Sequence, residues 1–164
     1  MREALRLARL AELEDEVPVG AVVVFENRII GRGYNKREGL SSPTAHAETI
    51  AIENAAHTLN SWRLEKCELF VTLEPCIMCS GVIQQSRIQR IYFGSRDPKA
   101  GAVISLYSLL SDERLNHQVE VFEGLLADES AQLLSQFFRR IRLRNQWTRA
   151  TVDRRRDVRV VEGA

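Results

Sequence analysis

The chain has 164 residues, of which 45% are hydrophobic and 27% charged, and its formal net charge is +1. This length predicts one domain with a substantial hydrophobic core, and the near-neutral charge by itself points to neither a nucleic-acid nor a membrane partner. No apolar run is long enough to span a bilayer, and no signal peptide is recognisable. Three cysteines argue against a disulfide framework, so we expect a cytoplasmic protein.

The first part of the sequence predicts a helix, a hairpin and a second helix. Leu and Ala recur at helical spacing from Met1 to Leu13 without a visible N-cap, so we expect the chain to begin inside a helix. The β-branched run at 21–25 and the segment at 29–34 predict two antiparallel strands. A charged loop then leads into a helix from about Ala45 to Leu59.

The remaining sequence predicts a parallel crossover followed by a long helix. Strands are expected at 67–73 and 88–93, with a helix that opens at Pro75 between them. A weaker helix near 105–110, a short strand at 119–122 and a helix from Ala127 to about Leu143 follow. We therefore expect a three-layer α/β domain over residues 1–145, with a central mixed five-stranded sheet flanked by helices. Residues 146–164 are expected to form an arginine-rich, poorly ordered tail.

Two motifs point to a zinc site, Thr44-Ala45-His46-Ala47-Glu48 and Thr72-Leu73-Glu74-Pro75-Cys76-Ile77-Met78-Cys79. Zinc prefers four tetrahedral ligands, and His46, Cys76 and Cys79 supply three. No fourth Cys or His lies near either motif, and an open position filled by water is typical of catalytic zinc. Zinc lowers the pKa of such a water molecule, and Glu48 is placed to act as its general base.

Two other interpretations of these motifs are possible. A Cys-x-x-Cys pair also occurs in redox proteins and in structural zinc knuckles, and direct coordination by Glu48 would close the site. The upstream His-x-Glu and the proline before Cys76 favour catalysis, because together they form the signature of zinc-dependent nucleobase deaminases. Two helix N-termini directed at one ion would also favour thiolate and hydroxide there.

From Val17 to the last helix, the sequence resembles the bacterial tRNA-specific adenosine deaminases of the TadA type, within the cytidine deaminase-like superfamily. The zinc motifs support only the superfamily. The segments that indicate the tRNA branch are Ser86-Arg87-Ile88, Phe93-Gly94-Ser95-Arg96-Asp97 and Asn116-His117-Gln118-Val119-Glu120. Family members usually carry a few more residues before the first helix, so the resemblance leaves the completeness of the N-terminus open.

The resemblance implies a role for each matching residue. One zinc ion per subunit would be bound by His46, Cys76 and Cys79, with Glu48 as the proton shuttle. Asn35 would help to hold the target nucleoside, although asparagine is also common after strands. Asp97 would lie near the ribose of a flanking nucleotide, where a carboxylate can accept a hydrogen bond from a 2′-hydroxyl. The alternative for Asp97 is a turn-capping role before Pro98.

The implied reaction is the hydrolytic deamination of adenosine to inosine at the wobble position of a tRNA anticodon, in bacteria usually an arginine tRNA. The implied partners are the anticodon stem-loop and a second copy of the chain in a homodimer. One alternative is a deaminase of a free nucleobase or nucleoside. Another is a non-catalytic, zinc-stabilised RNA-binding module.

Arginines on the last helix suggest contacts with RNA. Arg139, Arg140 and Arg142 could neutralise phosphates, although a solvated helix face is the alternative. Of Phe137 and Phe138, we expect at least one in the core. His57 is expected to serve a surface or core role rather than metal binding, and the sequence assigns no chemical role to His117.

Overall fold

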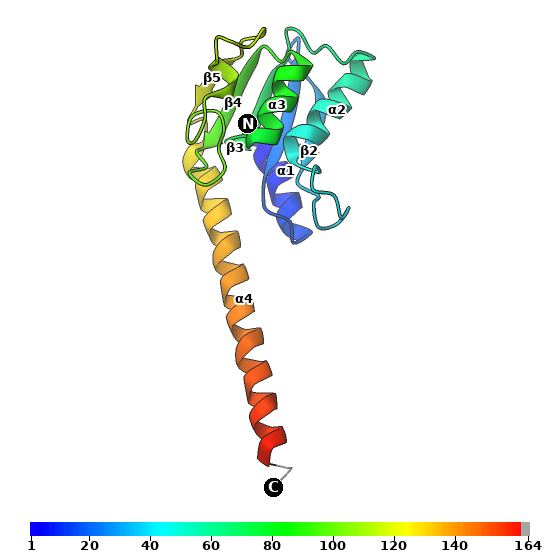
Figure 1. The fold of residues 1–164 in the computed structure, drawn as a ribbon. Coiled ribbons are helices and arrows are strands. Elements are labelled where there is room, and N and C mark those ends of the chain that lie inside the picture. Colours follow the sequence, from blue (N-terminus) through cyan, green and yellow to red (C-terminus); the bar gives the residue numbers. More distant parts are fainter. Residues whose placement is uncertain (162–164) are drawn as a thin grey trace.

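A computed structural model of the chain describes residues 1–161, with side chains described through residue 148. The elements follow one another along the chain as shown in Figure 1. They are α1 (Arg2–Leu13), β1 (Gly20–Phe25), β2 (Arg28–Tyr34), α2 (Ala47–Leu59), β3 (Glu68–Leu73), α3 (Ile77–Ser86), β4 (Arg90–Ser95), the short 3₁₀ helix η1 (Leu109–Ser111), β5 (Glu120–Glu123) and α4 (Ala127–Val161).

The five strands form one mixed sheet in the order β2-β1-β3-β4-β5. Strand β1 is antiparallel to both β2 and β3, whereas β3, β4 and β5 are parallel. Helices α2 and α3 pack on one face, where Ala51 and Ile83 join the same core as Val71 and Phe93. Helices α1 and α4 lie against the other face. The predicted three-layer fold with a mixed five-stranded sheet is confirmed.

The sheet topology brings the starts of α2 and α3 to the same edge. Tyr34 at the end of β2 pairs with Gly20 at the start of β1, and Val71 near the end of β3 pairs with Ala21. Strands β2 and β3 therefore end at one edge of the sheet, and the helices that follow them begin there. The segments that contain the two predicted zinc motifs meet for this reason.

Two glycines of β2 allow α2 to lie directly on the strand. A Cβ at Gly31 would lie 2.1 Å from the carbonyl oxygen of Ala51, and one at Gly33 would lie 2.2 Å from that of Ala47. Both distances are far below van der Waals contact, so only glycine fits at these positions. Helix α2 is thus held at backbone-to-backbone distance from the sheet.

Two predicted helices differ from the structure. The helix expected near 105–110 is wrong, because this segment forms only the single turn η1 at Leu109–Ser111. The N–H groups of Leu106 and Leu109 donate to the carbonyls of Gly101 and Ala102, and not to carbonyls four positions earlier as in an α-helix.

The last helix was predicted to end near Leu143, which is wrong, because α4 continues to Val161. No Gly or Pro interrupts this stretch, so the sequence contains no strong helix terminator there. The predicted boundary at residue 145 falls inside α4, and residues 162–164 lie outside the described part. The distal part of α4 extends away from the rest of the structure (Figure 1). Within the described residues, no helix has both the length and the apolar character that crossing a bilayer requires.

Candidate functional site

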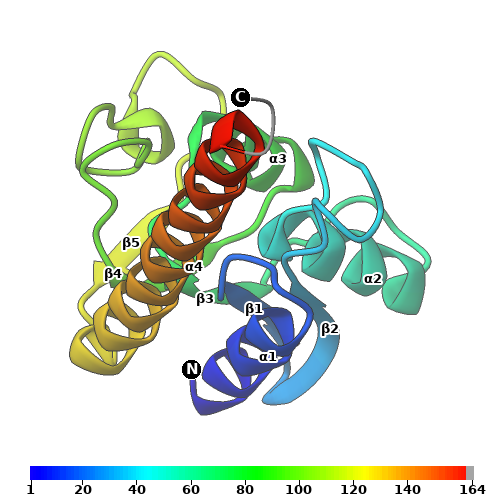
Figure 2. The same cartoon turned by 90° about the horizontal axis from the view of Figure 1, so that it is seen from below.

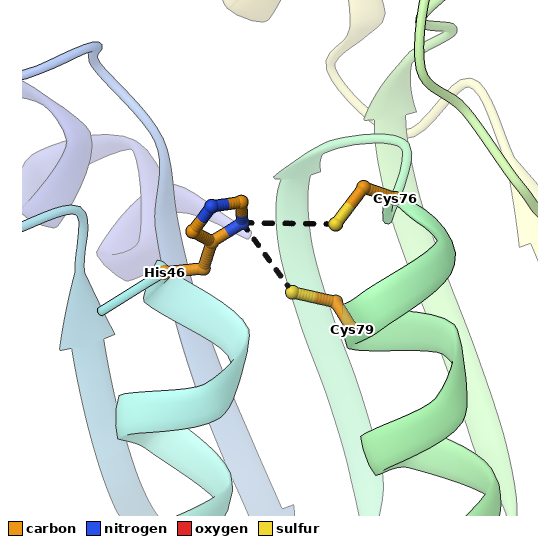
Figure 3. A group of neighbouring side chains, drawn as sticks. All are labelled: His46, Cys76 and Cys79. Atoms are coloured by element: carbon orange, nitrogen blue, oxygen red, sulfur yellow. Dashed lines mark hydrogen bonds between the residues drawn. The ribbon is translucent and has the colours of Figure 1, made fainter. Parts of the chain in front are cut away.

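The predicted zinc ligands lie at the N-termini of α2 and α3 (Figure 3). His46 is the N-cap residue of α2 and adopts an extended conformation, with φ −86° and ψ 153°. Cys76 is the N-cap residue of α3, and Cys79 lies in the first turn of that helix. The prediction that both motifs open helices is confirmed, although α2 begins at Ala47 rather than at Ala45 because His46 is extended.

The imidazole nitrogen lies at the distance from each sulfur that a tetrahedral zinc ion requires. His46 Nδ1 lies 3.7 Å from Cys76 Sγ and 3.6 Å from Cys79 Sγ. Bond lengths of about 2.3 Å for Zn–S and about 2.0 Å for Zn–N would separate sulfur and nitrogen by roughly 3.6 Å. Among the described residues, only these three form a His, Cys, Asp and Glu group compact enough to hold an ion. The donor set therefore fits a three-ligand zinc site.

The two thiols of the site differ in acidity. Hydrogen bonding from the Cys79 thiol, and then from His46, lowers the pKa of the Cys76 thiol to about 4. The hydrogen bond to Cys76, together with burial, raises the pKa of the Cys79 thiol. Zinc binds cysteines as thiolates, so binding of the ion would release a proton from this pair.

Glu48 is buried beside the ligands on the first turn of α2, with 4% of its surface exposed. Burial is the main cause that raises the pKa of its carboxyl to about 7, and the charge of Cys76 acts in the same direction. A carboxyl with a pKa near neutrality can both accept and donate a proton. This position and protonation suit a proton shuttle.

Asn35 connects the end of β2 to the start of α2. Its side chain is buried, and Oδ1 accepts a hydrogen bond of 2.9 Å from the backbone N–H of Ala47. Asn35 also lines a cavity of about 430 Å³ together with Arg37, Phe138 and Arg144. The structure thus displays a helix-capping contact, and the role of Asn35 toward substrate stays a prediction.

Asp97 lies in the loop that follows β4. Its Oδ1 accepts hydrogen bonds from the backbone N–H groups of Lys99, at 3.0 Å, and Ala100, at 3.2 Å. This is the turn-capping contact that the sequence offered as an alternative. Asp97 also lines a cavity of about 500 Å³ with Lys99, Arg142 and Phe138. A contact between Asp97 and a ribose stays a prediction.

The two cavities are neighbours, because Val17 and Phe138 line both of them. Volumes of 300–1,000 Å³ are typical of pockets for small ligands and cofactors. Asn35 lines the smaller of the two cavities, and Asp97 lines the larger one. The two cavities are therefore adjacent compartments, one beside Asn35 after β2 and the other beside Asp97 after β4.

The arginines of α4 differ in their partners. Arg140 lies 3.0 Å from Glu12 and contacts the ring of Phe137, with 5.4 Å between the guanidinium carbon and the ring centroid. Arg144 lies 3.3 Å from Asp15. Arg142 instead lines the larger cavity, and Arg139 is exposed. Arg140 is thus engaged within the chain, and the proposed phosphate contacts stay predictions.

Several other residues have clear positions. Phe137 is in the core, as expected for at least one of the pair, whereas Phe138 is 43% exposed. His57 is exposed on α2, and His117 Nε2 donates to the Ile88 carbonyl at 2.7 Å. This contact ties the loop before β5 to the start of β4.

Sequence reasoning missed Glu74, whose side chain is 2% exposed. The available signal was a carboxylate placed between an apolar strand and the proline that opens a helix. A second residue that it missed is Thr49, whose Oγ1 lies 3.9 Å from Cys79 Sγ.

Comparison with known proteins identifies similar families. Residues 1–95 match the family described as cytidine and deoxycytidylate deaminase zinc-binding region. The tRNA-specific adenosine deaminase of Bacillus subtilis (strain 168) is 46% identical over 149 residues, which cover 91% of this chain and 92% of the relative. The enzyme of the same name from Haemophilus influenzae is 50% identical over 143 residues, which cover 87% and 83%.

Solved structures give the same picture. A chain from studies of A-to-I editing by tRNA:A34 deaminases at the wobble position aligns with a TM-score of 0.79 and 45% identity, covering 82% of this chain and 97% of that one. A guanine deaminase from Nitrosomonas europaea aligns with a TM-score of 0.72 and 25% identity, covering 83% and 81%.

Proposed function

Because the chain belongs to the tRNA-specific adenosine deaminases, within the cytidine and deoxycytidylate deaminase family, we propose that it converts the wobble adenosine of a tRNA anticodon to inosine. The observation that carries this proposal is the three-donor zinc set with a buried Glu48 beside it. By family resemblance, an arginine tRNA is the substrate. A cytoplasmic location suits both tRNA and the free thiols of the site.

The proposed mechanism assigns the proton transfers to Glu48. His46, Cys76 and Cys79 would hold zinc, which when bound would lower the pKa of a water molecule toward neutrality. The Glu48 carboxylate moves both protons of the attacking water: the first goes to the ring nitrogen as the oxygen bonds to C6, and the second goes from the new C6 hydroxyl to the amino group, whose bond to C6 then breaks. The water oxygen ends on C6 of the base, and the amino group leaves as ammonia. Burial raises the pKa of the Glu48 carboxyl above the usual value of a glutamate, which favours a group that both accepts and donates a proton.

The adenosine must leave its stack in the anticodon loop to reach this site. We assign the holding of the target nucleoside to Asn35 and the contact with a flanking ribose to Asp97. The two cavities that these residues line provide room for the nucleotides on either side. A 2′-hydroxyl contact at Asp97 would distinguish RNA from DNA.

Replacement of Glu48 tests the mechanism. Glu48→Ala and the isosteric Glu48→Gln should each retain one zinc ion per chain and the wild-type circular dichroism spectrum. Each should lower the rate of inosine formation in an anticodon stem-loop by about 1,000-fold, because general acid–base catalysis typically contributes 10² to 10⁴. Metal analysis and single-turnover assays measure the two quantities. Turnover near the wild-type rate in either variant would remove Glu48 from the mechanism.

The choice of substrate is tested separately. The likeness to a guanine deaminase makes free bases the natural comparison. We expect inosine in an arginine tRNA stem-loop and no turnover of free adenosine, cytidine or guanine under the same conditions. Turnover of a free base without turnover of the stem-loop would contradict the tRNA assignment.

We also propose that the chain forms a homodimer through an apolar groove between α2 and α3. This groove has a volume of about 430 Å³, and its apolar lining includes Ile52, Trp62, Met78 and Val82. Trp62 is 60% exposed, which is unusual for so large an apolar side chain. A second copy placed on this groove would cover it and would lie beside the helices that carry the zinc ligands.

Gly81 offers a test of the interface. It lines the groove on α3, and a Cβ added there would meet no atom of the chain within 4 Å. Gly81→Arg should therefore leave the fold intact, because the side chain has room and arginine is a better helix former than glycine, which costs about 1 kcal/mol relative to alanine in a helix. The variant should sediment as a monomer where the wild type sediments as a dimer. As the matched control, Gly81→Ala should remain dimeric, and a dimeric Gly81→Arg would contradict this interface.

A further inference from the structure

The carboxylate of Glu74 is buried at the junction between β3 and α3, immediately after Leu73 and two residues before the ligand Cys76. Its two oxygens receive five hydrogen bonds, all from residues 97–105. Oε1 accepts from the backbone N–H groups of Val103 at 3.2 Å, Ile104 at 2.7 Å and Ser105 at 2.8 Å, and Oε2 accepts from Asp97 N at 2.9 Å and Ser105 Oγ at 2.5 Å.

These donors replace both water and a cation around the carboxylate. Among the described residues, no Arg, Lys or His nitrogen lies within ion-pair distance of Glu74, and the nearby Arg96 pairs with Glu123 at 2.7 Å. Burial acts to raise the pKa of Glu74, but hydrogen bonds from Ser105, Asp97 and Ile104 outweigh it and leave the pKa lowered. Consecutive backbone N–H groups that converge on one anion form a typical anion-binding nest. Here the anion is part of the chain itself.

The segment that surrounds Glu74 is also attached to the zinc-binding helix. Ala102 N donates to the Pro75 carbonyl at 2.8 Å, and Gly101 forms an isolated β-bridge with Cys76. A Cβ at Gly101 would lie 2.3 Å from Glu74 Oε2, so the loop closes directly onto the carboxylate. The same loop contributes Asp97 and Lys99 to the cavity of about 500 Å³.

We propose that Glu74 is a positioning residue for the reaction, whose carboxylate holds residues 97–105 as a preformed wall of the RNA-binding cavity. This inference rests on the proposed function. Four of the five surrounding donors are backbone N–H groups that cannot accept a hydrogen bond, and they require an acceptor at both oxygens of Glu74. A glutamine would have the same shape but would direct an NH₂ group at N–H donors, which leaves buried groups unsatisfied.

The test uses Glu74→Gln in the full chain. We expect one zinc ion per chain, as in the wild type, because the ligands themselves are unchanged. The backbone amides of residues 97–105 should exchange their hydrogens about 10-fold faster or more, because the loop opens locally. The KM for an anticodon stem-loop should rise about 10-fold while kcat changes less than about threefold, because the lost contacts act on substrate binding rather than on the reacting atoms.

Two further variants complete the experiment. Ser105→Ala removes one of the five donors and should shift both quantities in the same direction by a smaller factor. Glu68→Gln removes a carboxylate from the opposite end of β3, where it pairs with Arg90 at 3.2 Å, and should leave loop exchange and KM unchanged.

Three results would overturn the inference. The first is wild-type exchange in residues 97–105 of Glu74→Gln. The second is faster exchange with wild-type KM. The third is loss of zinc with a matching fall in kcat, which would make Glu74 a support for the ligands. Exchange and zinc content are measured without RNA. If the wild-type chain left the stem-loop unmodified, the proposed function would fail, and the exchange rates would still decide whether Glu74 holds the loop.

Discussion

Asn35 combines a contact that the structure displays with a role that stays a prediction. Its side-chain oxygen Oδ1 caps the start of α2 by accepting a hydrogen bond from the Ala47 N–H, which fixes the backbone next to His46. The substrate role that the family resemblance implies would use the amide group as a donor. Because the two roles use different atoms, a substitution can separate them.

We predict that Asn35→Asp keeps the cap and loses the donor. The unfolding midpoint should stay within about 2 °C of the wild type, because a carboxylate also accepts from Ala47 N–H and suits a helix N-terminus. The kcat/KM for the stem-loop should fall about 10- to 100-fold through the missing donor. Asn35→Ala, which loses both functions, should also lower the free energy of unfolding by about 1 kcal/mol.

Thermal unfolding and steady-state kinetics on the same samples measure both effects. A fully active Asn35→Asp would show that the residue acts only through the helix cap, and the nucleoside contact would then belong to another group.

The residues of the site differ in how far the sequence predicts them. His46, Cys76, Cys79 and Glu48 are recognisable because their spacing within short motifs reflects the chemistry directly. The role of Glu74 is different, because its partners lie 23 to 31 positions further along the chain. The position of Glu74 between an apolar strand and Pro75 could mark the residue, but only the fold brings its partners in residues 97–105 around it. The turn-capping contacts of Asp97 could be predicted, because their donors, the N–H groups of Lys99 and Ala100, are close to Asp97 in the sequence.

At the scale of elements, the site depends on two helix starts that the sheet topology brings together. Apart from the segment at 105–110, the predicted order of strands and helices is correct, because the apolar runs are short and Pro18, Pro43, Pro75 and Gly124 mark four of the connections. The failure at 105–110 has a specific cause. The Leu-rich sequence there is compatible with a helix, but the N–H groups of Leu106 and Leu109 donate to Gly101 and Ala102 rather than to carbonyls four positions earlier.

Removal of zinc should destabilise the protein by separating these helix starts. The two cysteines would then share a proton and could no longer bind His46 through a common ion. A ligand at 100 times its Kd stabilises the folded state by about 2.7 kcal/mol, so we expect a loss of at least this size on chelation. Calorimetry with and without a chelator measures it, and added zinc should restore the transition.

Cys76→Ala provides the control for this experiment, because its unfolding should respond little to the chelator. An unchanged transition in the chelated wild type would show that the ion contributes nothing to the connection between α2 and α3.

At the scale of the whole molecule, α4 links the sheet, α1 and the cavities. Arg140 and Arg144 pair with Glu12 and Asp15 at the end of α1, and these contacts dock the helix onto the body of the protein. The amino-acid composition of α4 could not show which of its arginines form ion pairs with the end of α1. Docking depends on where α1 ends, and that position follows only from the fold.

We predict that Arg142 and Arg140 respond differently to substitution. Arg142→Gln should reduce the slope of log affinity for the stem-loop against log salt concentration by about 0.7 for one lost contact with a single-stranded phosphate. Arg140→Gln should leave that slope unchanged and lower the free energy of unfolding by less than about 1 kcal/mol, because its ion pairs are exposed.

Fluorescence anisotropy at several salt concentrations and denaturant unfolding give the two values. Equal slopes for Arg142→Gln and the wild type would remove this residue from the RNA-binding surface.

Because α2 packs closely on β2, mutations in β2 can affect the metal site. Neither Gly31 nor Gly33 touches a zinc ligand, yet one added methyl group at either position would force α2 outward and carry His46 with it. The imidazole would then stand too far from the two sulfurs to share an ion with them. Substitutions at Gly31 or Gly33 would therefore lower the zinc content of the protein. Mutagenesis limited to the zinc ligands would not detect this effect.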